Sequence, residues 1–280
     1  MTDLIRRPVG APLDARPLTE PVSRADVAAF TREMKRRFPA PERGVSYYLM
    51  LGVLIFGGCV PLLWAATVIF ASAVDTGNTS LLWVAGLTAA MFGLLTTTIL
   101  RGVFPSIRRR TEAYRIARFA AANGLEYLNR VDNPPLPGWI FRSGINKRAT
   151  NVVRVARPKE IEIGNYQYTE PRGESSVTQA WGYVTARIDT PLRDLRLLDV
   201  TGDFTARGAD AYGIRALFTP AVLARLATPR GKLDVEVADG RLFLYTSSPA
   251  STAEPATWTH LFDMVDVVSS TLERWTPRDR

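Results

Sequence analysis

The sequence predicts a hairpin of two membrane-spanning α-helices followed by an α+β domain, which has a curved, mostly antiparallel sheet packed by a C-terminal helix. Three observations support this fold class. Residues 46–74 and 76–100 form two uncharged stretches, later segments alternate apolar and polar side chains, and a helical apolar stripe runs through residues 253–275. Each uncharged stretch exceeds the ~20 apolar residues that a helix needs to cross a bilayer.

The chain is expected to divide into six parts, because composition and charge change sharply at their boundaries. The first part is rich in proline and arginine without an apolar period, which is typical of disorder. In chain order the parts are a disordered tail (1–22), a basic amphipathic juxtamembrane helix (23–45), the two-helix hairpin (46–100), a basic juxtamembrane helix (101–124), the α+β domain (125–276) and a short tail (277–280).

The basic excess lies beside the uncharged stretches. Residues 1–46 carry nine Lys+Arg against six Asp+Glu, and residues 101–118 carry six against one, so these two segments account for the whole formal charge of +8. The positive-inside rule then predicts that both termini lie in the cytoplasm. Only four of the 35 Lys+Arg residues are lysines, a composition typical of a GC-rich bacterial genome, so we expect a bacterial plasma-membrane protein. A nucleic-acid binder would place this excess on its folded domain, so nucleic acid is not expected as a partner. The side chains expected to contact anionic lipid headgroups are Lys35, Arg36, Arg37, Arg108, Arg109 and Arg110.

Small residues form a seam along the second uncharged stretch. Gly86, Ala89, Ala90 and Gly93 follow the spacing i, i+3, i+4, i+7, which permits close helix approach. We expect the seam to pack against the first stretch or against a second copy of the chain. Neither stretch contains an ionisable side chain, so a transporter path for polar substrates is not indicated.

The region after residue 125 is predicted to consist mainly of antiparallel strands, because apolar and polar residues alternate with a period of two. Asp239–Gly240 joins two such segments and is typical of a tight hairpin turn. A capping box at Ser251 and Glu254 predicts the start of the last helix, over about 253–275. The predicted strands cover 151–157, 160–168, 181–189 and 233–237, with the second arm of the hairpin following residue 240.

The residue types on which catalysis usually depends are scarce. His260 is the single histidine and Cys59 the single cysteine, so the chain cannot assemble a zinc site of Cys/His type. It also lacks a phosphate-binding glycine-rich loop. We therefore predict no metal, no cofactor and no catalytic residues, and we expect His260 to be exposed and without function.

Two acidic pairs keep an enzymatic alternative open. Glu160 and Glu162 share one face of a predicted strand, as do Asp234 and Glu236. Carboxylates with separated pKa values in a cleft are suited to general acid–base catalysis. A solvated strand face explains both pairs more simply.

A cluster of four aromatic residues is predicted as the candidate interaction surface. Tyr166, Tyr168, Trp181 and Tyr183 lie on two predicted strands. If these strands are neighbours, the rings offer stacking surfaces with polar tips that suit an interface. The alternative is cross-strand packing that only stabilises the sheet.

The motifs EIGNYQY (162–168), WGYV (181–184), Leu197–Asp199 and FTP (218–220) resemble those of an uncharacterised family of actinobacterial membrane proteins. These proteins pair two transmembrane helices with a cytoplasmic α+β domain, so the resemblance implies this architecture and a bacterial origin, but no activity, cofactor or site residues.

The predicted function is therefore an integral membrane protein that presents a cytoplasmic α+β binding or interaction module at the inner leaflet. Its partners would be anionic lipid headgroups, an unidentified protein or a second copy. The alternatives are a membrane-anchored hydrolase or transferase that uses carboxylates and arginines, and an accessory subunit of a larger membrane complex.

Overall fold

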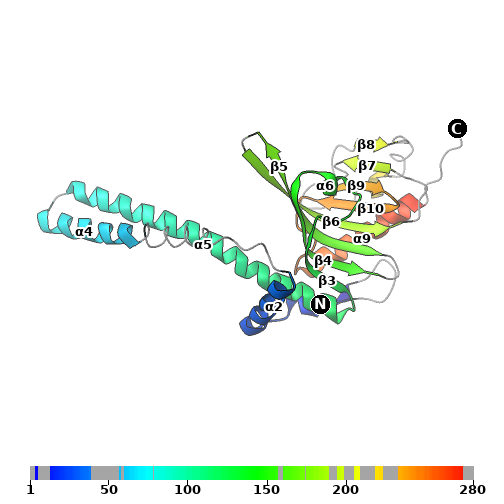
Figure 1. Cartoon of the computed structure of the whole chain (residues 1–280), viewed down its shortest axis with the longest axis horizontal. Coiled ribbons are helices and arrows are strands. Elements are labelled where there is room, and N and C mark those ends of the chain that lie inside the picture. The colour runs from blue at the N-terminus through cyan, green and yellow to red at the C-terminus, as the bar shows by residue number, and fades with distance from the viewer. Residues whose placement is uncertain are drawn as a thin grey trace. The chain divides into compact units, whose positions relative to one another are not determined.

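The computed structural model describes residues 4–5, 13–38, 57, 60–77, 79–156, 160–173, 175–188, 194–198, 205–208, 218–222 and 233–273. The chain separates into two compact units. One comprises Met1–Phe30 with Glu112–Arg280, and the other comprises Thr31–Thr111. The elements, labelled in Figure 1, are β1 (Leu4–Ile5), β2 (Leu13–Asp14), α1 (Arg16–Thr19), α2 (Arg24–Arg37), α4 (Val60–Thr76), α5 (Thr79–Ala122), β3 (Glu126–Asp132), α6 (Trp139–Arg142), β4 (Ile145–Val155), β5 (Ile161–Arg172), β6 (Ser175–Arg187), β7 (Asp194–Leu198), β8 (Thr205–Gly208), β9 (Leu233–Ala238), β10 (Arg241–Thr246) and α9 (Pro255–Glu273).

An antiparallel sheet is the centre of the larger unit. Its eight described strands follow the order β3-β4-β5-β6-β10-β9-β7-β8, and every pair of neighbours in this order is antiparallel. The predicted hairpin between β9 and β10 is confirmed. Asp239 and Gly240 both have positive φ, at 50° and 69°, which is the backbone that a two-residue turn of matching twist requires.

Each face of the sheet carries its own buried core, because successive side chains of a strand point to opposite faces. The first core is mostly aliphatic and includes Ile163, Val184 and Leu244 together with residues of α9, the end of α5 and the β2–α1 segment. The second core is aromatic and includes Tyr166 and Phe243 together with residues of α6 and the loop before it. The α+β part of the prediction therefore agrees with the structure.

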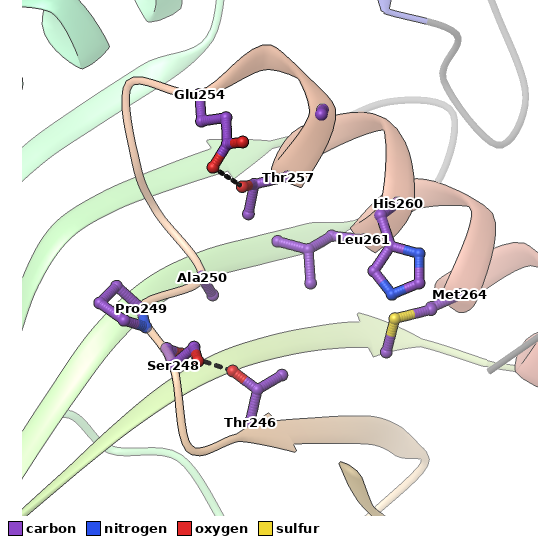
Figure 2. A pocket seen from close by; sticks show the side chains of 10 residues that line it. Thr246, Ser248, Pro249, Ala250, Glu254, Thr257, His260, Leu261 and Met264 are labelled. Carbon is purple, nitrogen blue, oxygen red and sulfur yellow. Dashed lines mark hydrogen bonds between the residues drawn. The ribbon is translucent and has the colours of Figure 1, made fainter. Parts of the chain in front are cut away.

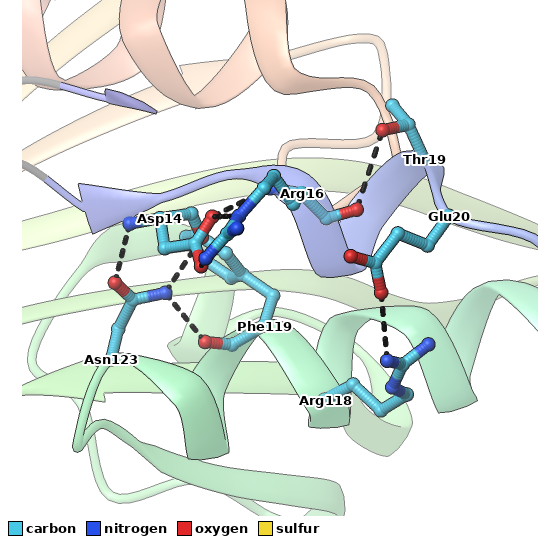
Figure 3. A network of polar contacts seen from close by, with 7 residues as sticks. All are labelled: Asp14, Arg16, Thr19, Glu20, Arg118, Phe119 and Asn123. Atoms are coloured by element: carbon cyan, nitrogen blue, oxygen red, sulfur yellow. Dashed lines mark hydrogen bonds and ion pairs between the residues drawn. The ribbon is translucent and has the colours of Figure 1, made fainter. Parts of the chain in front are cut away.

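The N-terminal segment differs from the expected disordered tail. Leu13 and Leu18 are fully buried in the first core. The main-chain N–H and C=O of Asp14 bond to the side-chain amide of Asn123 at 2.7 and 2.9 Å, and Arg118 donates to Glu20 at 2.8 Å (Figure 3). Two buried leucines and these contacts fix the described residues 13–20, although their composition is typical of a flexible segment.

The predicted membrane hairpin is wrong. Within the part of the chain that the structure describes, no helix combines the length and the apolar character needed to cross a membrane. The first uncharged stretch contributes the 17-residue helix α4, and the second is part of the 44-residue helix α5, which continues through Pro105 and the basic residues 108–110. The rest of the first predicted span, residues 46–56, 58 and 59, lies outside the described residues. The plasma-membrane location and the two-pass topology that were derived from this hairpin are corrected with it.

Candidate functional site

A cavity of about 320 Å³ lies between the end of β10 and the N-terminal half of α9. It is mainly apolar in its lining, with hydroxyl groups and one imidazole among the apolar side chains. We call it the α9 pocket. Its lining residues, drawn in Figure 2, are Thr246, Ser248, Pro249, Ala250, Glu254, Ala256, Thr257, His260, Leu261 and Met264.

One face of α9 forms a wall of the α9 pocket, because residues three and four positions apart lie on the same side of a helix. Thr257, His260, Leu261 and Met264 follow this spacing and all line the cavity. The same helix buries Trp258 on its core side, where the indole Nε1 donates to the main-chain oxygen of Thr252 at 2.8 Å. The Trp258 anchor and the apolar stripe of α9 therefore set the orientation of the pocket face.

The opposite wall is the segment 246–251, which one side chain of β5 holds in place. The Asn165 side-chain oxygen accepts the main-chain N–H groups of Ala250 and Ser251 at 2.8 and 3.0 Å, and its nitrogen donates to the Ser251 oxygen at 2.8 Å. Gly182, paired with Asn165 across the sheet, lets this segment approach closely. A Cβ at Gly182 would lie 2.3 Å from the main-chain oxygen of Ser248, so only glycine fits there.

His260 supplies the distinctive polar atom of the α9 pocket. Its Nε2 is buried and has no hydrogen-bond partner among the described residues. Figure 2 shows the imidazole beside the side chain of Met264. Burial lowers the pKa of His260 from its ordinary 6.5, against the opposing effect of the Asp263 carboxylate, because desolvation disfavours the charged form. His260 is therefore neutral at pH 7 and only partly exposed, in contrast to the predicted exposed side chain.

A smaller cavity of about 100 Å³ lies on the other side of the 246–251 segment. Tyr166, Trp181, Ser248 and Pro249 are among its lining residues. The Tyr166 hydroxyl is buried without a hydrogen-bond partner among the described residues. Burial, followed by the nearby Tyr168, raises the pKa of Tyr166 to about 12. This phenol therefore stays protonated at physiological pH.

The structure gathers the four predicted aromatic residues in or beside the second core. Tyr166, Tyr168 and Tyr183 are at most 2% exposed, and Trp181 packs at the edge of the same core. The ring of Phe141 lies 4.5 Å from that of Tyr166 and 5.1 Å from that of Tyr183, between centroids. Their rings thus pack inside the unit. An interaction role for these residues stays a prediction.

The predicted solvated face of the acidic pairs is wrong for three of the four residues. Glu160 is exposed, whereas Glu162, Asp234 and Glu236 are at most 9% exposed. Glu162 accepts from the Tyr183 hydroxyl at 2.7 Å and from Arg154 Nε at 2.7 Å.

Glu236, on β9, also accepts from a buried phenol, and its other partners lie in α6. It accepts from the Tyr245 hydroxyl at 2.5 Å and from the main-chain N–H of Trp139 at 2.8 Å. Arg142 Nη2 lies 3.6 Å from its other oxygen. Glu236 thus links the sheet to α6, whereas Glu162 links three neighbouring strands, β4, β5 and β6. Neither carboxylate lines the α9 pocket.

The predicted lipid-contact residues are exposed on two helices. Lys35, Arg36 and Arg37 lie at the end of α2, and Arg108, Arg109 and Arg110 lie in α5. Arg37 Nε forms an ion pair with Glu33 at 2.7 Å. Binding of anionic lipid by these side chains stays a prediction.

The predicted seam residues are also exposed. Gly86, Ala89, Ala90 and Gly93 all face outward, and a Cβ added at either glycine would meet no atom within 4 Å. They therefore do not pack against the described part of α4. Contact with a second molecule stays a prediction.

Sequence reasoning did not find the α9 pocket. Its walls come from a helix and from a turn that Asn165 holds from about 85 positions away along the chain, and no local pattern records that contact. Among the described residues, no group of three or more His, Cys, Asp or Glu side chains is placed to hold a metal ion.

No family model and no curated protein matches the chain. Among solved structures, it is similar to the crystal structure of the mycobacterial trehalose monomycolate transport factor A, TtfA, with 11% sequence identity and a TM-score of 0.43. The match covers 60% of this chain and 98% of that one. A likeness of this strength indicates nothing about ligand or activity.

Proposed function

We propose that the larger unit is a non-catalytic binding module that takes a small, largely apolar molecule into the α9 pocket. The observation that carries this proposal is the combination of an apolar cavity with an unpartnered imidazole nitrogen in one of its walls. Ligand sites commonly have this composition, with a few polar groups that fix orientation inside a hydrophobic lining.

The size of the cavity supports a ligand with about two fused rings or a short branched chain. Its volume is about 320 Å³, and an engineered apolar cavity of roughly 150 Å³ binds benzene. A cavity twice as large accommodates a two-ring molecule. Leu261, Met264 and Ala250 would contact the apolar body of such a ligand.

The imidazole supports a ligand that also carries one hydrogen-bonding group. A buried polar atom without a partner costs about 1–3 kcal/mol, and a new hydrogen bond recovers part of this free energy. A hydroxyl group serves either tautomer of His260, because it both donates and accepts. Thr257 and Ser248 add hydroxyl groups to the same lining.

Titration calorimetry of the full chain with 2-naphthol and with naphthalene tests the proposal. We expect both to bind, with 2-naphthol tighter by about 2- to 12-fold, as a hydrogen bond of about 0.5–1.5 kcal/mol predicts. His260→Leu should remove this difference and keep the binding of naphthalene.

A matched pair of variants places the binding in the α9 pocket. Ala256 is an exposed residue of the lining, so Ala256→Trp should fill the cavity without displacing buried atoms and should abolish binding. Thr259→Trp adds the same ring at an exposed position of α9 outside the lining and should bind as the unchanged chain does. Absence of binding, or binding that Ala256→Trp does not weaken, overturns the proposal.

A further inference from the structure

The first half of β6 has a free edge among the described strands. β6 pairs with β5 along almost its whole length, from Ser175 to Ala186. On its other side, β10 pairs only with the second half, from Gly182 to Arg187. Residues 175–181 therefore have no described strand on that side, and every second residue of a strand directs its N–H and C=O outward. Unpaired groups of this kind are a template for another strand.

The two outer edges of this hairpin differ in composition. On β5, beyond the last residue paired with β4, stand Glu170, Pro171 and Arg172. Charges and proline are the features with which proteins block an edge. The opposing segment of β6 reads SSVTQAW over 175–181 and contains neither a charge nor a proline. The β6 edge is thus left open while the β5 edge of the same hairpin is protected.

β3, an edge strand of the same sheet, is also charged. β3 carries Glu126, Arg130 and Asp132, and Arg130 Nε contacts Asp132 at 2.8 Å. An added strand would have to desolvate these groups. The first half of β6 is therefore the edge at which strand addition meets the least electrostatic opposition.

We propose that a second copy of this chain pairs with the β6 edge, antiparallel and about a twofold axis. In such a pair the residue on the axis faces its own copy, so a charged residue there meets a like charge, which opposes association. The uncharged segment 175–181 lacks this obstacle. A twofold axis also satisfies both copies with one and the same surface, as in most homodimers.

The pairing is centred on Val177. This side chain is 38% exposed, and the centred register places it opposite its own copy, Ser176 opposite Thr178, and Ser175 opposite Gln179. Nearer to β10, Ser248 and Pro249 line the small cavity beside Ala180 and Trp181, so the second strand ends before this point. The resulting ladder is short, and the dimer is therefore weak and concentration-dependent.

Sedimentation velocity of the full chain over a wide range of concentrations tests the proposal. We expect a reversible monomer–dimer equilibrium. Val177→Lys should raise its dissociation constant by about tenfold or more, because two ammonium groups then meet across the axis. Thr259→Lys adds the same charge at an exposed position on α9 and should leave the equilibrium unchanged.

Disulfide cross-linking reports the register independently. In a Cys59→Ser background, Val177→Cys should form a disulfide-linked dimer on mild oxidation, whereas Glu170→Cys, at the position paired with Val177 on β5, should not. A chain that is monomeric at all concentrations, a dimer that Val177→Lys does not weaken, or equal cross-linking at both positions overturns the proposal. None of these results bears on ligand binding in the α9 pocket.

Discussion

The two faces of the sheet are buried by different means. A 19-residue helix, α9, covers much of the first face with a continuous apolar stripe. The second face is covered by α6, a helix of only four residues, and by residues of the loop before it. Phe119 and Trp258 pack together on the first face, with centroids 4.9 Å apart. Tyrosines hydrogen-bonded to glutamates are found on the second.

The difference follows from the hydrogen bonds of the covering segment. A long helix satisfies most of its own main-chain groups, so the face beneath it needs few polar partners. A short helix leaves its first N–H groups without partners inside the helix. On the second face, the Glu236 carboxylate accepts the N–H of Trp139, the first residue of α6. The buried carboxylate of Glu236 therefore helps to hold the short helix α6 on the sheet.

Two buried phenols donate to the carboxylates on this face. A Cβ at Gly138 would lie 2.1 Å from the Tyr245 hydroxyl, and a Cβ at Gly164 would lie 2.8 Å from the ring of Tyr183. Both glycines thus leave room for a tyrosine that bonds to a glutamate. Burial, followed by the adjacent carboxylates Glu162 and Glu236, raises the pKa of Tyr183 and Tyr245 well above the ordinary value. Both phenols remain hydrogen-bond donors at any physiological pH.

The largest expected effect is on the helix-covered face. Trp258→Ala removes a fully buried ring that packs on Phe119 and should lower the free energy of unfolding by about 3–5 kcal/mol. Trp181→Ala, at the partly buried edge of the second core, should cost clearly less. Urea unfolding of both variants measures the comparison. Equal losses of stability would contradict the view that the first core depends on Trp258.

A smaller loss of unfolding free energy is expected when Glu236 no longer bonds to α6 on the second face. Glu236→Ala leaves the Trp139 N–H and the Tyr245 hydroxyl without their acceptor and should cost about 3 kcal/mol. Glu160→Ala removes an exposed carboxylate that pairs with Arg187 and Arg241. Exposed pairs contribute about 0–1 kcal/mol, so this variant is the control. If both substitutions lower the free energy of unfolding equally, Glu236 does not hold α6 on the sheet.

Two tyrosines of the second core separate hydrogen bonding from packing. Tyr183→Phe removes a hydroxyl that donates to Glu162 and should cost about 1–2 kcal/mol. Tyr166→Phe removes a buried hydroxyl that has no partner among the described residues, so it should be neutral or slightly stabilising. Both keep the ring. Thermal unfolding midpoints of the two variants measure the difference, and a larger loss for Tyr166→Phe would refute this account.

The sequence allows one face of the sheet to be predicted well and the other poorly. The hairpin of β9 and β10 and the terminal helix, with its stripe of Leu261, Phe262 and Val265, have regular periods, and the structure contains them close to the predicted bounds. By contrast, β4 and β6 begin earlier than the predicted strands, at Ile145 and Ser175 instead of residues 151 and 181. The cover of the second face has no period, since it consists of a proline-rich turn and four helical residues. Without a visible cover, Glu162 and Glu236 were assigned to solvent.

Two further differences, the ordered N-terminal segment and the α9 pocket, arise from contacts that no local pattern contains. The disordered tail was inferred from composition, which does not register that Leu13 and Leu18 meet a core formed more than a hundred residues later. The membrane hairpin is a different case. It was inferred from the length and hydropathy of two stretches, whereas the described helix of the first stretch has 17 residues and the second stretch continues within α5 into the basic residues 108–110. No pattern in the sequence marks Asn165, although its amide fixes the wall of the α9 pocket.

The smallest expected effect concerns the one titrating imidazole, which lies in the wall of the α9 pocket. Because the pKa of His260 is lower in the folded chain than its ordinary 6.5, the unfolded chain binds more protons below that pH. The free energy of unfolding should therefore fall as the pH drops through about 6.5.

His260→Gln isolates this contribution, because the chain contains no other histidine. Acidic groups such as Asp132, whose pKa is lowered chiefly by its hydrogen bond from Arg130, titrate equally in both proteins and cancel in the difference. Urea unfolding near pH 7.5 and near pH 5.5 should show a steeper loss of stability for the unchanged chain than for His260→Gln. Saturating 2-naphthol should increase this difference if the ligand bonds to the neutral imidazole, because protonation of His260 then also costs binding free energy. Parallel pH profiles would mean that the imidazole is as well solvated in the folded chain as in the unfolded one.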